Sequence, residues 1–146
     1  MNDQMNDKTI TDPPIYRIKS VRFKKFALDI GDDDSLIISS KRKNTQLFQI
    51  FHDRIINKES GKVLSAKKDG VGRFEIVQII SDDADNERWI IEESNKEGCI
   101  LFNVKYPTMC MTIEEADYCD SASLVLQPFD GSQNQKFSFY CIKNFD

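Results

Sequence analysis

Few residues of this sequence are of the types that catalyse reactions. The one histidine, His52, ends the apolar run LFQIF, and a lone histidine at such a position is more typical of a surface turn than of a general base. A cysteine nucleophile would need that histidine beside it, and nothing in the spacing indicates this. The motifs GxSxG and HExxH and a Gly-rich phosphate loop do not occur. We therefore expect a protein that is not an enzyme.

The sequence contains four cysteines, all in its last third: Cys99, Cys110, Cys119 and Cys141. They show no CxxC spacing, which argues against a zinc site. In an oxidising compartment they could form two disulfides, with Cys110 and Cys119 as the most local pair. Free thiols in a reducing cytosol are an equally good interpretation.

The acidic stretch DDADNE at 82–87 spaces its carboxylates alternately, as a calcium loop does. However, Arg88 stands where an EF-hand needs glycine, and no terminal glutamate follows in frame. The run of three aspartates in GDDDS, at 31–35, is most simply a solvated turn. We expect neither a metal nor a cofactor.

The most regular chemistry-bearing feature is a motif that occurs three times, as TQLFQI at 45–50, NERWII at 86–91 and NQKFSF at 134–139. In each copy a Gln or Glu precedes a large aromatic residue by two positions: Gln46 and Phe48, Glu87 and Trp89, Gln135 and Phe137. The copies are roughly 40–50 residues apart, a period typical of repeated supersecondary units.

The segments between the motifs are short and β-like, rich in β-branched and aromatic residues, and separated by turn signals. Each unit has an opening strand, an apolar cluster (26–30, 62–66 or 109–113), a further strand and the motif. This predicts twelve strands in three repeats. One exception is TIEEAD at 112–117, where Thr112 and Glu115 fit a capping box and predict a single helical turn.

The 146 residues suffice for one domain, and the formal net charge of −4 argues against a nucleic-acid-coating protein. Residues 1–14 are polar, end in Asp-Pro-Pro and are expected to form a flexible tail. They have no apolar signal-peptide core, and no stretch predicts a membrane span. Cytoplasmic and secreted locations both remain open, the second for a trimmed form.

With these motifs the sequence resembles the ricin B-type lectins, whose signature is a Gln-x-Trp near the end of each of three repeats. The resemblance implies an all-β fold, a β-trefoil of twelve strands over residues 15–146, with repeats at about 15–52, 53–94 and 95–143. It also implies that the motif's aromatic residue packs in the core and that its Gln hydrogen-bonds the turn backbone. Only Trp89 retains the family's tryptophan, and there the Gln has become Glu87.

The family's sugar site combines an Asp after the second strand, an aromatic platform on or after the third strand, and an Asn before the motif's Gln. The first repeat offers Asp29 and Gln46, and the third offers Asn134 and Gln135 with Thr112 at the Asp position. Tyr118, Asp120 or Phe129 could complete the third site. The second repeat has Ser65 and Asn86 at these positions, with Ile79 and Ile80 in place of a platform.

We therefore expect a carbohydrate-binding module whose partners are glycans or glycoproteins. Its predicted sugar-binding residues are Asp29, Gln46, Thr112, Asp120, Asn134 and Gln135. The alternative is a trefoil that binds a protein, either as a protease inhibitor or as a cytokine-like or growth-factor-like module. In the second case a basic patch would recognise a protein or an anionic glycan; its residues would be Arg17, Lys19, Arg22, Lys24, Lys25 and Lys41 to Lys43.

Overall fold

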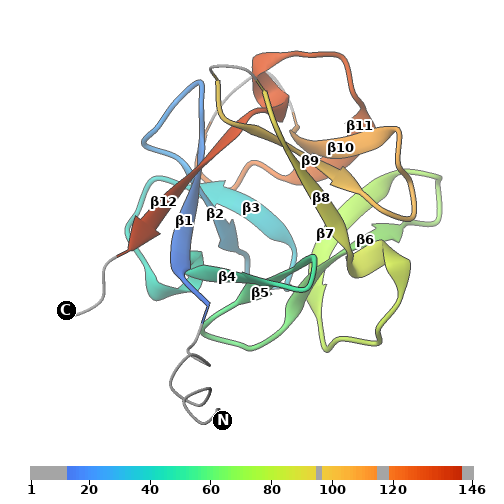
Figure 1. Cartoon of the computed structure of the whole chain (residues 1–146), viewed down its shortest axis with the longest axis horizontal. Helices are drawn as coiled ribbons and strands as arrows, with labels where there is room; N and C mark the ends of the chain where they lie inside the picture. Colours follow the sequence, from blue (N-terminus) through green and yellow to red (C-terminus); the bar gives the residue numbers. More distant parts are fainter. Residues whose placement is uncertain (1–12, 95–96, 115–118, 143–146) are drawn as a thin grey trace, which may run out of the picture.

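The computed structural model describes residues 13–94, 97–114 and 119–142, which form twelve β-strands and three 3-10 turns (Figure 1). The first repeat contains β1 Ile15–Ser20, β2 Ala27–Ile30, β3 Leu36–Ser39, η1 Asn44–Gln46 and β4 Phe48–Phe51. The second contains β5 Arg54–Asn57, β6 Val63–Lys68, β7 Phe74–Ile79, η2 Asp85–Glu87 and β8 Trp89–Glu93. The third contains β9 Cys99–Asn103, β10 Met109–Ile113, β11 Leu124–Pro128, η3 Gln133–Gln135 and β12 Phe137–Ile142.

The first and last strand of each repeat build a barrel. Strand β1 pairs with β12 and β4, β4 pairs with β5, and β9 pairs with β8 and β12, all antiparallel. Between β5 and β8 the backbone N–H of Trp89 donates to the carbonyl of Asp53 at 2.8 Å. The first and last strands therefore pair with each other, and β1 and β12 lie side by side in Figure 1.

The two middle strands of each repeat form a hairpin: β2 with β3, β6 with β7, and β10 with β11. The three hairpins touch one another in a triangle. Ser35 bridges to Val77, Ile37 bridges to Ser123, and β11 pairs with β7. Each hairpin thus contacts the other two, and together they cover one end of the barrel.

The threefold pseudosymmetry extends to single hydrogen bonds. In each repeat, the backbone carbonyl of the residue after the motif's Gln or Glu accepts a hydrogen bond. The donor is the backbone N–H of the residue that directly follows a barrel strand. The three bonds are Lys58 to Leu47 at 2.8 Å, Val104 to Arg88 at 2.9 Å, and Val21 to Lys136 at 3.1 Å. The three motifs are therefore equivalent in space as well as in sequence.

The motif aromatics lie at the centre of the core. Phe48, Trp89 and Phe137 are at most 1% exposed, and the indole Nε1 of Trp89 donates to the carbonyl of Leu64 at 3.0 Å. Their same-face neighbours two residues later pack against the core while staying partly exposed. The expectation that these aromatics are core residues is confirmed.

The expected helical turn at 112–117 is wrong at its start, because Thr112 and Ile113 end strand β10. There the Thr112 hydroxyl donates to the carbonyl of Cys110 at 3.0 Å and does not cap a helix. Glu115 and the rest of that segment lie outside the described residues, as does the tail before residue 13. Over the described ranges, no helix has the length and apolar character to cross a membrane.

Candidate functional site

The motif's Gln or Glu ends each 3-10 turn, and its side chain is buried in all three repeats. In the third repeat, Gln135 Oε1 accepts the backbone N–H groups of Asp130 at 2.9 Å and Gly131 at 3.3 Å. Its Nε2 donates to the carbonyl of Pro128 at 2.9 Å and to Oγ1 of Thr112 at 3.2 Å. The expected structural role of the glutamine is confirmed here.

The first repeat brings together two of the predicted sugar ligands, Asp29 and Gln46. Gln46 Nε2 donates to Oδ2 of Asp29 at 3.3 Å and to the carbonyl of Lys41 at 2.5 Å. Oδ1 of Asp29 accepts from the Thr45 hydroxyl at 2.5 Å and from the N–H of Ile30 at 2.8 Å. The carboxylate is 0% exposed, so its hydrogen bonds serve the turn itself.

The second repeat replaces the amide with a charged group. Glu87 Oε2 accepts from Nε of Arg54 at 2.6 Å and from the Ser81 hydroxyl, and Oε1 accepts the N–H of Asp82 at 3.0 Å. Burial alone would raise the pKa of Glu87. The hydrogen bonds from Ser81, Arg54 and Asp82 outweigh that effect and lower its pKa to about 2. Glu87 therefore holds its turn as a carboxylate.

The other predicted residues divide between two places. Thr112 is 3% exposed and contacts Gln135, and Asn134 Nδ2 donates to the carbonyl of Ile113 at 3.1 Å. Asp120 does not join them, because it binds Ser40 of the first repeat. It accepts the backbone N–H of Ser40 at 2.6 Å and the Ser40 hydroxyl at 3.1 Å. The sequence cannot indicate this, because the pairing depends on how the 119–123 loop lies along β3. Phe129 is 48% exposed, and Tyr118 lies outside the described residues.

An open hollow of about 300 Å³ lies at the corresponding positions of the second repeat. We call it the second-repeat hollow. Ser65, Ile79 and Asn86, the three positions that the resemblance assigns to a sugar site, line it together. Val77 and Ile79 supply apolar surface, and Asn86 Nδ2 is held by the carbonyl of Ala66 at 3.0 Å. The volume is at the lower end of the range for small-molecule sites.

An aromatic ring that no sequence motif indicates also lines this hollow. Tyr106 lies in the connection between β9 and β10, with its ring centroid 4.6 Å from that of Phe74. Buried Asn103 positions it by accepting the N–H of Tyr106 at 3.2 Å while donating to the carbonyl of Asn86 at 3.1 Å. An aromatic ring at this hollow therefore comes from the following repeat, although the sequence had indicated only Ile79 and Ile80 there.

The polarity of the second-repeat hollow differs from that of the family's usual site. Ser65 stands where the family has an Asp, and it is 2% exposed. Three lysines line the hollow instead: Lys67, Lys68 and Lys105. Donors thus outnumber acceptors, which favours a ligand rich in acceptor oxygens.

The groups considered for catalysis and metal binding are placed apart. His52 and Asp53 form the two-residue turn between β4 and β5, both with positive φ, and both are exposed. All four cysteines are free thiols. Among the described residues, no group of three or more His, Cys, Asp and Glu side chains is arranged to hold a metal ion.

No protein-family model matches the chain, and no curated protein matches it in sequence. Solved structures do match it in shape. The designed threefold-symmetric protein ThreeFoil superposes with a TM-score of 0.77 at 16% identity, covering 86% of this chain and 97% of that one. The Macrolepiota procera ricin B-like lectin, solved with lactose, gives 0.75 at 14% identity, covering 90% and 97%.

The C-half of the earthworm R-type lectin, solved with GalNAc, gives a TM-score of 0.68 at 17% identity, covering 89% of this chain and all of that one. Identities this low establish shape and leave ligands to be argued from the residues of this chain. The chain is an all-β protein with the β-trefoil fold, and its structural neighbours include the ricin B-like lectins.

Proposed function

We propose that this protein binds carbohydrate without catalysing a reaction, and that the second-repeat hollow is its principal site. The observation that carries the proposal is the convergence of Asn86, Tyr106 and the three lysines around one hollow of about 300 Å³. A sugar presents hydroxyls along its edge and C–H groups on its face. Asn86 and the lysines would meet the hydroxyls, and Tyr106 would contact the face.

The buried residues of the other two repeats are weaker candidates. Asp29, Gln46, Thr112 and Gln135 are at most 3% exposed, and their polar atoms bond within the turns. Direct contact between these four side chains and a sugar stays a prediction that would require the turns to open. Affinity at one shallow site would be modest, since little apolar area is removed from water.

The first experiment is a glycan array followed by NMR titration with GalNAc, lactose and 6'-sialyllactose, the sugars seen with structural neighbours. We expect shifts centred on Asn86, Lys105 and Tyr106. Shifts confined to the first or third repeat would move the site there. The absence of binding to every glycan tested would refute the carbohydrate proposal.

A pair of variants localises the site. Tyr106→Leu keeps apolar bulk against the core but removes the aromatic face, and we expect about tenfold weaker sugar binding with an unchanged fold by circular dichroism. Phe129→Leu makes the same change at an exposed aromatic of the third repeat and should leave binding unchanged. The reverse pattern would assign binding to the third repeat.

A further inference from the structure

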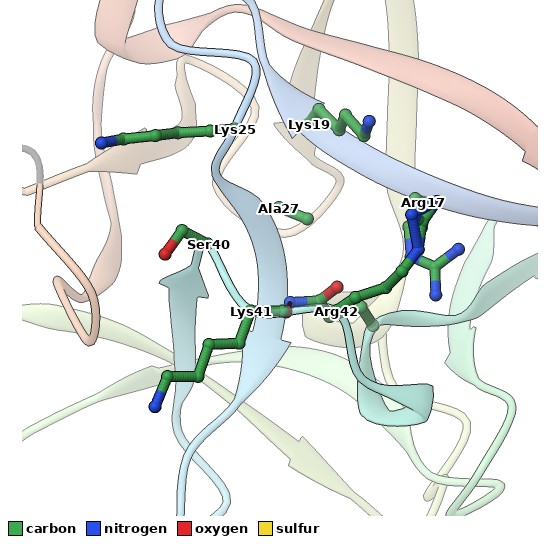
Figure 2. Close-up of a pocket in the computed structure, with 8 residues that line it drawn as sticks. Arg17, Lys19, Lys25, Ala27, Ser40, Lys41 and Arg42 are labelled. Atoms are coloured by element: carbon green, nitrogen blue, oxygen red, sulfur yellow. Dashed lines mark hydrogen bonds between the residues drawn. The ribbon is translucent and has the colours of Figure 1, made fainter.

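A second, smaller hollow of about 70 Å³ lies beside β1, β2 and the segment that follows β3. We call it the cationic hollow, because five basic side chains line it: Arg17, Lys19, Lys25, Lys41 and Arg42. Figure 2 shows them arranged around Ala27, with Lys25 and Lys41 extending to one side and Arg17 and Arg42 meeting at the other. No carboxylate is among the described residues that line it.

The internal repeats show what occupies the matching place elsewhere in the chain. Ser20 pairs with the motif aromatic Phe137, and Asn57 pairs in the same way with Phe48. Three residues earlier on each strand stand Arg17 and Arg54, which are therefore equivalent positions. In the second repeat Nε of Arg54 donates to the Glu87 carboxylate at 2.6 Å.

The first repeat keeps the arginine of this pair and lacks the carboxylate, because Gln46 stands where the second repeat has Glu87. Gln46 uses its Nε2 on Asp29 and on the carbonyl of Lys41. As a result, Nε of Arg17 is buried without a hydrogen-bond partner in the described part of the chain. An unpaired buried donor is unfavourable, and more so on a charged group.

The electrostatics point the same way. Burial and the neighbouring Arg42 lower the pKa of Arg17, since both disfavour its charged form. Two carboxylates bond to residues that line the hollow, and both have hydrogen-bond donors of their own. Asp29 accepts from Thr45 and Gln46, and Asp120 accepts from Ser40. The hydrogen bonds from Ser40, and the nearby charges of Lys41 and Lys25, lower the pKa of Asp120.

We propose that the cationic hollow binds an oxyanion, a sulfate or carboxylate group of the kind carried by acidic glycans. The anion would lie in the hollow beside Gln46 and accept from Nε of Arg17, as the Glu87 carboxylate accepts from Nε of Arg54 in the second repeat. Arg42 and Lys19 supply further charge, and Ser40 and Gln46 line the wall. A volume of about 70 Å³ suits a few small polar atoms, so a sugar ring would remain outside.

The direct test is calorimetric titration with inorganic sulfate, with a sulfated heparin disaccharide and with the same disaccharide after desulfation. We expect the sulfated sugar to bind, the desulfated sugar to bind at least tenfold more weakly, and rising NaCl to weaken binding. Binding of sulfate alone would keep the oxyanion site and remove the glycan source. Equal binding of both disaccharides would overturn the proposal.

Single charge removal supplies a matched pair of variants. Arg17→Gln should weaken binding of the sulfated disaccharide about tenfold or more, because a charge-assisted hydrogen bond is lost. Lys58→Gln removes one exposed charge elsewhere and should leave the affinity within about twofold. Equal affinities of the two variants would refute a specific role for Arg17.

A charge-neutral test uses the second repeat as its template. The double variant Asp29→Ser with Gln46→Glu copies Ser65 and Glu87, and its net charge equals that of the original chain. We expect the new carboxylate to pair with Arg17 and to reduce anion affinity to the level of Arg17→Gln. Unreduced affinity would overturn the proposal; if the double variant fails to fold, Arg17→Gln decides. Tyr106→Leu should leave anion binding intact, so this site and the sugar site can fail independently.

Discussion

Arg54 binds Glu87 through Nε, at 2.6 Å from Oε2, and so ties the start of β5 to the turn that precedes β8. The carboxylate is 0% exposed, and Ser81 and Asp82 donate its remaining hydrogen bonds. In a buried ion pair that is fully hydrogen-bonded, these interactions offset the cost of removing the charges from water. Removal of one partner leaves a buried charge without that compensation. The second turn is therefore held by a carboxylate at the motif position where the other two have an amide.

Glu87→Gln should lower the free energy of unfolding by about 1–3 kcal/mol at pH 7. The pKa of Glu87 in the folded protein, about 2, lies below that of an ordinary glutamate, so its contribution is present above about pH 4–5 and is lost as pH falls toward 2. The difference between the two proteins should shrink over that window. Urea unfolding at pH 7, 5 and 3, followed by the fluorescence of the single tryptophan, measures it.

Glu59→Gln is the control for this experiment, because Glu59 is exposed and its replacement should change stability by less than about 0.5 kcal/mol. A Glu87→Gln protein as stable as the original at pH 7, or one whose deficit at pH 3 is as large as at pH 7, would contradict the assignment of the ion pair.

The sequence predicts the architecture well because each repeat is specified by residues close together in the sequence. Each repeat needs a buried aromatic such as Phe48 or Trp89, and a Gln or Glu two residues earlier to satisfy a tight turn. These requirements recur at a fixed place in each unit, so three weak motifs reinforce one another. The helical turn predicted at Thr112 is wrong and shows the limit of such local patterns. A capping pattern does not produce a helix there, because Ile113 packs in the core as part of a strand.

The candidate sites are less visible in the sequence because they join residues from different repeats. Tyr106 reaches the second-repeat hollow from the next repeat, held by Asn103, and no local pattern indicates that. Asp120 meets Ser40 across 80 positions of the chain. The unpaired Nε of Arg17 appears only when its strand register is compared with that of Arg54.

Trp89→Phe should lower the free energy of unfolding by about 2 kcal/mol. The change opens a cavity and leaves the carbonyl of Leu64 without the indole donor at 3.0 Å. Circular dichroism during urea unfolding measures the effect. Ile90→Ala, at the next residue and 49% exposed, should cost markedly less. Equal losses in the two variants would mean that Trp89 has no special place in the core.

The four thiols should differ in reactivity. Burial raises the pKa of Cys110 to about 12, and burial also raises the pKa of half-buried Cys99. Because the thiolate is the reactive form, iodoacetamide at pH 8 should modify exposed Cys119 and Cys141 first and Cys110 only after unfolding. Mass spectrometry of peptides from native and urea-treated protein reads this order. Rapid labelling of native Cys110 would contradict its burial.

Gly98→Ala should be the most disruptive of the single-methyl additions. Gly98 has a φ of +72°, and an added Cβ would overlap the carbonyl oxygen of Phe137 and lie 2.7 Å from Cγ2 of Val21. Gly131 has a similar φ of +78°, but nothing lies within 4 Å of its Cβ position. Gly131→Ala should therefore cost only the backbone strain, about 1 kcal/mol. Gly98→Ala adds a steric clash where β9 meets β12, and we expect at least twice that loss. Thermal unfolding of the two variants separates the steric clash from the backbone strain. Equal melting temperatures would show that the pairing of β9 with β12 can relax to accept a side chain.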